Sequence, residues 1–395
     1  MKNIQSSYVL WLPSWYPNKA EPYNGDFIQR HARAVSLTEK VHVIYVMRDP
    51  SAAITSSILT ETKSEGELKE TLIYYYLRPM KFKWLERLLS FRIYVRLYKA
   101  AVLKCLKEEG RPKLVHLYIA FKAGVIALWL KKRFGLAYVL SEQWTIYLPG
   151  AEPGFPNLPF SNRYLIKKIM RQAAGVMVVS DYLGQRLQQL FGVSKPAVIP
   201  NVVDEKIFFY RKESSHSANR FVHVSTLTYQ KNPEAIVEAF SILKQKGCLF
   251  TLDVIGPQMP GLKALVRRYG LENDIFFRGE MPQEQLVKFV QNADALILYS
   301  RYETFGCVLI EANACGVPVI VSDIPVLREN VTDGFNGMFA AAENGVALSD
   351  QILYFIQNKT QFDKEEIAGY TIKKFNYTRI GAQFEVWYKE HAADC

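Results

Sequence analysis

The sequence predicts an α/β chain of two Rossmann-like, doubly wound domains. Its 395 residues exceed what one hydrophobic core usually supports. Apolar runs of strand length alternate with helical patterns, which is typical of βαβ units around a parallel sheet. The alternation stops once, at a polar connection, and then starts again, so we expect two domains.

The first domain is expected to cover residues 1–203. Its apolar runs predict strands at 8–12, 41–46, 114–118, 137–140, 176–179 and 197–199. The helical patterns between them predict helices over 27–36, 81–107, 124–134, 162–174 and 182–190.

The second domain is expected to cover residues 204–375. It follows the connection 200–204, and the polar run 211–220 marks the change in composition. The predicted strands lie at 221–224, 249–255, 275–277, 295–299 and 319–321, with helices that include 233–246 and 283–292. Ligands of such sheets bind beyond the carboxyl ends of the strands, so we expect the functional site there.

The positive charge of the chain is unevenly placed. The formal net charge is +11, and residues 81–107 contain eight basic residues and one acid, Glu86. Arg92, Arg96 and Lys99 fall at helical spacing on one face, which suits contact with anionic lipid headgroups. The alternative is an amphipathic helix whose basic face is solvated. No nucleic-acid-binding motif accompanies the patch, so nucleic acid is not an expected partner.

Targeting signals and membrane spans are not expected. The apolar run 8–12 ends at Pro13 and is too short for a secretory signal. No apolar stretch reaches the roughly 20 residues of a transmembrane helix. The five cysteines are odd in number and lack metal-ligand spacing. We therefore expect a cytoplasmic protein without structural disulfides, placed at the inner face of the cell membrane if the basic helix binds lipid.

The most informative segment follows the predicted strand 295–299. Glu303 comes directly after this strand and Glu311 about two helical turns later, so both carboxylates can border one crevice. Gly306 lies between them, and its missing side chain lets the first turn of the helix approach a ligand closely. The free amides of that turn form a site for a diphosphate.

With these residues the sequence resembles glycosyltransferase family 4, a group of retaining GT-B enzymes with two glutamates separated by seven residues. The resemblance extends over most of the chain, and its segments occur in the family's order. They are 11–17, 199–201, 231–232, 277–279, 303–311 and 318–319. The resemblance implies a GT-B fold, in which two Rossmann-like doubly wound domains face each other across a cleft. It also implies transfer of a sugar from a nucleotide-sugar donor.

The resemblance also implies roles for single residues. Glu311 matches the residue that binds the ribose hydroxyls, for which an ionised carboxylate offers two acceptor oxygens. Glu303 matches the residue beside the donor sugar. Lys231 matches the cation on the diphosphate, where it would neutralise the charge that develops as the nucleotide leaves. The other implied donor-binding residues are Phe305, Gly306, Cys307 and Val308, through main-chain amides, and Arg278, Gly279 and Met281, near the nucleobase.

Further implied positions lie in the first domain. Gly25 precedes the helix 27–36, where the family uses glycine to approach the donor phosphate; a glycine that only permits a turn is the alternative. Gln143 stands where many members have a histidine, and it can hydrogen-bond but cannot titrate, which excludes general-base catalysis by this residue. A C-terminal helix over about 376–395 is expected to pack back on the first domain, with hinges near 200–204 and Phe375.

Two other segments depart from the family pattern. Thr226 stands in Ser-Thr-Leu where the family usually has Gly-Arg-Leu, so a hydroxyl replaces a cation expected on the diphosphate. After the segment 318–319, residues 322–325 replace a common glycine pair, and only Glu329 matches further on.

We expect no metal and no other cofactor. The sequence contains no Asp-x-Asp motif of the kind through which a divalent metal bridges donor phosphates, and Lys231 with a helix N-terminus would take over that role. The six histidines show no metal-ligand spacing, and His31, His116 and His223 are expected to be packed structural residues.

Together with the family resemblance, these features predict a metal-independent hexosyltransferase. Retention of configuration is implied by the resemblance alone. The favoured donor is a UDP-sugar, and the expected acceptor is a saccharide or lipid-linked saccharide in bacterial cell-surface polysaccharide synthesis. One alternative is another GT-B enzyme, such as a nucleotide-sugar epimerase, which reaction products would distinguish. The other is a non-catalytic nucleotide-sugar-binding relative, which Thr226 and Gln143 make conceivable. The presence of Glu303, Gly306 and Lys231 favours catalysis.

Overall fold

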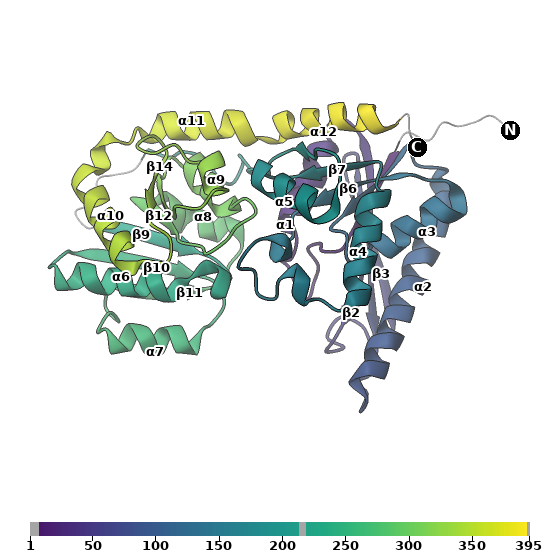
Figure 1. Cartoon of the computed structure of the whole chain (residues 1–395), viewed down its shortest axis with the longest axis horizontal. Coiled ribbons are helices and arrows are strands. Elements are labelled where there is room, and N and C mark those ends of the chain that lie inside the picture. The colour runs from purple at the N-terminus through teal and green to yellow at the C-terminus, as the bar shows by residue number, and fades with distance from the viewer. Residues whose placement is uncertain (1–7, 213–218, 393–395) are drawn as a thin grey trace.

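The computed structural model describes residues 8–212 and 219–392, which form two α/β domains arranged side by side (Figure 1). The chain leaves the first domain after β8 and returns to it with its last helix (Figure 1). This arrangement confirms the two Rossmann-like, doubly wound domains predicted from the sequence. Part of the polar run 211–220, Cys395 and the end of the predicted C-terminal helix lie outside the described residues.

The first domain contains a mixed sheet of eight strands within the described residues, in the order β3-β4-β2-β1-β5-β6-β7-β8. Neighbouring strands are parallel except β3 and β4, which form an antiparallel hairpin at one edge. The strands are β1 (Tyr8–Pro13), β2 (Lys40–Asp49), β3 (Ile58–Glu65), β4 (Leu68–Tyr76), β5 (Leu114–Tyr118), β6 (Tyr138–Glu142), β7 (Gly175–Val178) and β8 (Ala197–Val198).

Helices cover both faces of this sheet, and alternate residues of β1 show how. Tyr8, Leu10 and Leu12 belong to the core under α2, α3, α4 and α5, whereas Val9 and Trp11 pack with α1 and α12. Strands buried on both faces are apolar throughout, so β1 could be predicted from the sequence as a continuous apolar run. The helices are α1 (Asp26–Val35), α2 (Lys83–Glu109), α3 (Gly124–Phe134), α4 (Phe160–Gln172), α5 (Asp181–Phe191) and α12 (Tyr377–Ala392).

The second domain contains a parallel sheet in the order β11-β10-β9-β12-β13-β14. Helices α6, α7 and α10 pack on one face, α8 and α9 on the other, and α11 lies beside α9. The strand order reverses between β9 and β12, the point at which open sheets bind ligands. The strands are β9 (Asn219–Val224), β10 (Phe250–Ile255), β11 (Ile275–Gly279), β12 (Ala295–Leu298), β13 (Val319–Ser322) and β14 (Gly337–Ala340). The helices are α6 (Pro233–Gln245), α7 (Pro260–Arg268), α8 (Gln283–Gln291), α9 (Cys307–Ala314), α10 (Gly345–Asn358) and α11 (Lys364–Phe375).

The hairpin of β3 and β4 is a feature that the sequence did not predict. β3 is mostly exposed and reads Ile-Leu-Thr-Glu-Thr-Lys-Ser-Glu, so it has no apolar face of its own. Charged side chains are common on edge strands because they discourage pairing with other chains. The hairpin is held by its pairing with β2, a long-range contact that no local pattern reveals.

The two crossings between the domains contact each other. The Val203 amide donates to the Phe375 carbonyl at 2.9 Å, and the Tyr377 hydroxyl donates to the Asp204 carboxylate at 3.0 Å. α11 ends at Phe375 beside the second domain, and α12 continues over the first (Figure 1). The two segments predicted as hinges are therefore neighbours in space.

Gly381 sets how closely α12 approaches α1. A Cβ atom at this position would lie 2.4 Å from the Ala34 carbonyl oxygen, so no larger side chain fits without moving the helices apart. Gly381→Val is expected to lower the free energy of unfolding by about 1–3 kcal/mol, measured by urea denaturation. The control is Gly369→Val on α11, where a Cβ atom would meet nothing within 4 Å. Equal losses in both variants would contradict the close packing of α12.

Candidate active site

A cavity of about 420 Å³ lies between the two domains, at the carboxyl ends of β9, β10 and β12. Residues of both domains line it. Most of the residues predicted for the site do so: Gln143, Thr226, Lys231, Met281, Glu303, Phe305, Gly306, Cys307, Val308 and Glu311. The fold thus gathers into one cleft positions that lie up to 168 residues apart in the chain, from Gln143 to Glu311.

Glu303 and Lys231 form an ion pair at the wall of this cleft. Glu303 lies just beyond β12 and is only 4% exposed. Its carboxylate also accepts hydrogen bonds from the Ser300 hydroxyl at 2.9 Å and the Gln230 amide at 3.3 Å. Because Ser300 and Gln230 fix the carboxylate, it holds the Lys231 ammonium group in place at the cavity.

The amino end of α9 opens into the same cavity. Gly306 precedes the helix with φ of 87°, a left-handed conformation that favours glycine. No acidic residue lies in the first turn, and no side chain of the described residues caps it. The amides of this turn, with the positive end of the helix dipole, are therefore available to an anion.

Glu311 lies within α9 and is paired across the cleft. Its Oε1 accepts a hydrogen bond from Arg30 Nη1 of α1 at 2.7 Å, and both side chains are almost fully buried. Burial raises the pKa of the Glu311 carboxyl group, although the Arg30 charge opposes this shift. Sequence analysis did not find Arg30, since no motif marks it and its partner is 281 residues away.

Three more hydrogen bonds join the two domains near the cleft. The Ser180 hydroxyl donates to the Thr304 carbonyl at 2.7 Å. Glu329 accepts from the amides of Asp181 and Tyr182, both at 2.8 Å, and so its carboxylate caps α5 of the opposite domain. Glu329, noted in the sequence only as a family match, thus contributes to domain closure.

The first domain positions Gln143 at the cavity, and the buried carboxylate of Glu142 fixes the loop that carries it. Glu142 accepts hydrogen bonds from the amides of Gln143 and Trp144 at 3.0 Å and from the Ala120 amide at 2.9 Å. This fixes the turn after β6 and leaves Gln143 Nε2 buried without a partner among the described residues, like Asn201 Oδ1 nearby. Buried polar atoms are rarely left unpaired in proteins, so both atoms indicate where polar groups of a ligand would bind.

Comparison with known proteins identifies the fold and family. A family model described as "Glycosyltransferase Family 4" matches residues 40–206, and a second, "Glycosyl transferases group 1", matches residues 204–375. The chain belongs to glycosyltransferase family 4. The resemblance stated from the sequence is thereby confirmed.

Named relatives agree with this assignment. N-acetyl-alpha-D-glucosaminyl L-malate synthase of Bacillus anthracis is 24% identical over 71% of this glycosyltransferase and 75% of the relative. Sucrose-phosphate synthase from Thermosynechococcus elongatus has a similar structure, with a TM-score of 0.78 and 19% identity over 98% of this chain and 100% of that one. Anabaena HepE, solved with UDP and glucose, has a TM-score of 0.71 and is 18% identical, over 97% of this chain and 100% of that one. The predicted GT-B fold is therefore confirmed.

Three residues predicted for the site of this glycosyltransferase do not line its cavity. Gly25 has φ of 73° at the start of α1, and a Cβ atom there would lie 2.8 Å from the Trp15 carbonyl carbon, so the glycine lets the loop after β1 pack on α1. Arg278 pairs with Asp253 at 2.6 Å and is partly exposed. Gly279 accepts a hydrogen bond from the amide of Gly256, which does line the cavity.

The family resemblance implies that Glu311 binds the ribose hydroxyls, and with the raised pKa of its carboxyl group this role predicts a pH dependence of nucleoside binding. The ionised carboxylate accepts ribose hydroxyls best, so affinity is expected to be full above this pKa and to fall as the pH decreases through it. A glutamate with an unperturbed pKa would lose its charge only at about pH 4.3. The measurement is titration calorimetry with the nucleoside, which has no phosphate to titrate. Glu311→Gln should bind more weakly, with a flat pH profile; an equally steep profile in this variant would contradict the assignment.

The cluster of potential metal ligands found among the described residues is not part of the cleft lining. The donor atoms of His42, Cys105 and Glu109 are within 4.8 Å of one another, but Lys69 already pairs with Glu109 at 2.6 Å. The expected structural histidines are packed and hydrogen-bonded: His31 Nε2 to the Pro200 carbonyl, His116 to Tyr388 and Ser141, and His223 to the Ile297 carbonyl and Ser225.

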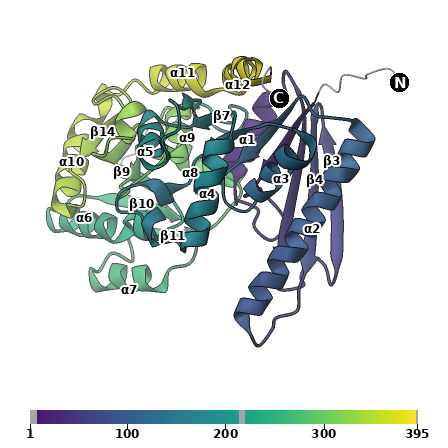
Figure 2. The ribbon, with the colours of Figure 1, turned by 45° about the vertical axis from the view of Figure 1, so that its right-hand side comes forward.

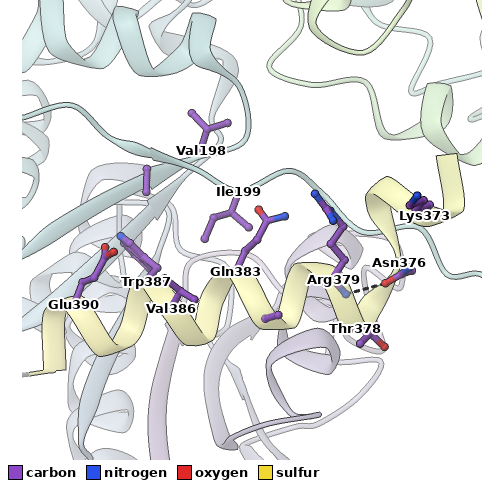
Figure 3. Close-up of a pocket in the computed structure, with 12 residues that line it drawn as sticks. Val198, Ile199, Lys373, Asn376, Thr378, Arg379, Gln383, Val386, Trp387 and Glu390 are labelled. Carbon is purple, nitrogen blue, oxygen red and sulfur yellow. Dashed lines mark hydrogen bonds between the residues drawn. The ribbon is translucent and has the colours of Figure 1, made fainter. Parts of the chain in front are cut away.

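A larger hollow of about 740 Å³ lies between β8 and α12 (Figure 3). Val198 and Ile199 border it on one side and Gln383 and Trp387 of α12 on the other (Figure 3). It contains none of the residues predicted for donor binding. Size alone therefore does not single out the candidate site. The convergence of charged and unpaired polar groups does.

Proposed function

We propose that this glycosyltransferase moves a hexosyl-type sugar, with retention of configuration and without a metal, from a nucleotide-sugar to a saccharide-bearing acceptor. The observation that carries the proposal is the convergence of Lys231, Glu311 and the uncapped amino end of α9 on one interdomain cavity. Each element suits a different part of a nucleotide-sugar: a cation and amides for the diphosphate, and a carboxylate for ribose.

Transfer needs stabilisation of the leaving nucleotide. Lys231 and the amides of α9 are preorganised where negative charge develops on the diphosphate, so no reorganisation is required as the glycosidic bond breaks. Glu303 orients Lys231 and borders the space for the donor sugar. Gln143 can bind a sugar hydroxyl through its unpaired Nε2 but cannot accept a proton at neutral pH. As the family resemblance implies, the proton of the acceptor hydroxyl would pass to an oxygen of the leaving phosphate.

UDP is the favoured nucleotide. The solved relative Anabaena HepE holds UDP and glucose, and its fold superimposes on nearly the whole chain. The nucleobase would lie near Glu280 and Met281, which line the cavity beyond β11. These residues belong to the short loop between β11 and α8.

Titration calorimetry of UDP, GDP and ADP, in the presence of a chelator, tests the proposal. One nucleotide is expected to bind selectively, and Lys231→Ala and Glu311→Ala are expected to weaken it. Turnover assays with the corresponding nucleotide-sugars then separate transfer from epimerisation by the products formed. Absence of binding by a folded protein, or binding that requires Mg²⁺, would overturn the proposal and favour a non-catalytic or metal-dependent relative.

Aromatic side chains of the first domain suit a saccharide acceptor. Trp15, Tyr23 and Trp144 line the cavity opposite the donor-binding residues, and Trp15 meets Trp144 edge to face at 5.7 Å. Aromatic faces combined with a few polar groups are typical of sites that hold small organic ligands. We assign this side of the cleft to the acceptor.

Two helices favour an acceptor anchored in a membrane. Trp84, Leu88 and Phe91 are exposed at i, i+4, i+7 on α2, and Phe160 and Tyr164 are exposed on α4. Both groups lie at the amino ends of their helices. These ends are at the edge of the sheet from which the cleft opens. α2 extends beyond the sheet at this end (Figure 2). α4 contains four basic residues and no acid. We therefore assign these ends to contact with an anionic bilayer at the inner face of the membrane, in cell-surface polysaccharide synthesis.

One detail of the predicted basic face differs in the structure. Arg92 and Arg96 are exposed, whereas Lys99 is half-buried with its ammonium 4.9 Å from the ring of Trp129 on α3. A cation engaged in this way is less available to lipid. No helix within residues 8–212 and 219–392 is both long and apolar enough to cross a bilayer.

Removing the exposed charges of α2 is expected to weaken vesicle binding. Arg92→Ser with Arg96→Ser should lower affinity for anionic phosphatidylglycerol vesicles by about tenfold or more, since each cation near such a surface contributes about 1 kcal/mol. Flotation with vesicles of anionic and of neutral lipid measures this. The control is Arg267→Ser with Arg268→Ser, which removes the same charge from exposed positions on α7. Equal losses in both double variants would contradict a specific membrane face.

A further inference from the structure

The donor cavity contains fewer basic than acidic side chains. Thr226 lines it where the family resemblance expects arginine, and its hydroxyl faces that of Thr228 at 3.4 Å. Lys231 is already paired with Glu303. A diphosphate would thus bring further negative charge into a cleft that is not yet neutralised. The charged residues that line it are Asp26, Glu280, Glu303 and Glu311 against Arg30 and Lys231.

Arg30 has binding capacity that the protein does not use. The residue is 4% exposed and lines the cavity from α1. Its Nη1 donates to Glu311 at 2.7 Å and its Nη2 to Asp26 at 3.2 Å, while its Nε is buried without a partner in the described chain. A guanidinium group has five N–H donors, so a buried one with an unpaired Nε is left incompletely satisfied.

We propose that Arg30 is the second cation of the donor site and binds the diphosphate in place of the arginine that Thr226 replaces. This inference rests on the proposed function and adds to it a residue of the opposite domain. The planar guanidinium matches two phosphate oxygens at once, which a lysine cannot do.

Both carboxylates beside Arg30 can accommodate this role. Glu311 has two oxygens, so Oε1 can keep Arg30 while Oε2 accepts a ribose hydroxyl. Asp26 also accepts a hydrogen bond from the Gln283 amide of α8 at 3.1 Å, so it keeps a partner when Nη2 turns to the phosphate. The ion pairs of the empty site therefore hold Arg30 at the point where the donor enters.

Supply of this cation from α1 couples donor binding to domain closure. Lys231 and α9 belong to the second domain, whereas Arg30 belongs to the first. A diphosphate bound to all three bridges the domains, and the open form would bind it more weakly. The pairs that already join the domains, Arg30 to Glu311 and Gln283 to Asp26, are the contacts around which the donor closes the cleft.

Calorimetry with UDP and uridine tests the assignment, because only UDP has the phosphates. If the preceding nucleotide screen selects GDP or ADP, GDP with guanosine or ADP with adenosine replaces UDP with uridine. Arg30→Gln is expected to lower UDP affinity by about 10- to 100-fold and uridine affinity much less, so the ratio of the two affinities falls. Arg30→Lys should retain part of the ratio, and Thr226→Arg should restore it in the Arg30→Gln background.

The control variant is Arg33→Gln, on the same helix but outside the cavity lining. It should leave the ratio unchanged. A ratio unchanged in Arg30→Gln, or equal losses for UDP and uridine, would overturn the inference while the proposed function stands. Failure of the unmodified protein to bind any nucleotide would overturn both. The ratio is measured within one variant, so a partly unfolded sample lowers both affinities and does not imitate the expected result.

Discussion

Lys231→Ala is expected to lower kcat by about 10²- to 10³-fold, the effect of removing one preorganised group from a site of developing charge. The ammonium group is held at the cavity by Glu303, which is itself fixed by Ser300 and Gln230. Its attraction to the diphosphate grows as the nucleotide leaves. Lys231→Ala should therefore remove more stabilisation from the transition state than from the ground state. The Michaelis constant for the donor should therefore change less than kcat.

Steady-state kinetics over a range of nucleotide-sugar concentrations measures the effect. Lys246→Ala is the matched control, because this lysine is exposed and pairs with Asp350 away from the cleft. A kcat that falls by less than about threefold in Lys231→Ala would contradict a role in the transition state and leave Lys231 as a structural partner of Glu303.

Glu303→Gln is expected to lower kcat by a similar factor, about 10²-fold or more, although the substitution preserves the shape of the side chain. The neutral amide cannot hold the Lys231 ammonium group, and its own NH₂ group competes with the Ser300 and Gln230 donors. Because the two residues act as one unit, the double variant Lys231→Ala with Glu303→Gln should be only slightly slower than Lys231→Ala.

Fully multiplicative effects in the double variant would show that the two residues act independently. Removing one partner of a buried ion pair also costs about 3–5 kcal/mol of stability, so rates are compared on the folded fraction. Glu234→Gln, in the first turn of α6, removes the same charge outside the cavity and serves as the control.

The sequence predicts the central strands and the grouping of Glu303, Gly306 and Glu311 at one cavity, because each rests on a local pattern. β12 is an apolar run followed by Glu303, and Gly306 and Glu311 follow at fixed spacing on one turn and helix. Local spacing suffices here because one strand–loop–helix unit carries the chemistry. β14, in contrast, has four residues and a glycine start, which gives no clear strand signal.

The contacts between the domains are not predictable in this way. Arg30 reads as one more basic residue on a helix with Arg33, and only the fold brings it to Glu311. Glu142 reads as a polar residue after a strand, yet four donors surround its buried carboxylate. Such roles depend on contacts between segments that are far apart in the sequence. A single sequence contains no local pattern that indicates these contacts.

The path of the backbone makes the second domain an insertion within the first. The chain completes its first sheet at β8, builds the whole second domain, and returns as α12 to cover Trp11 and His116. A fragment that ends at residue 203 would lack this cover, so it would not be a self-sufficient folding unit. Residues 204–375, by contrast, enter and leave at the Val203–Phe375 contact and form an exchangeable module. Chimeras between relatives should therefore exchange that internal module and retain the terminal helix of the recipient.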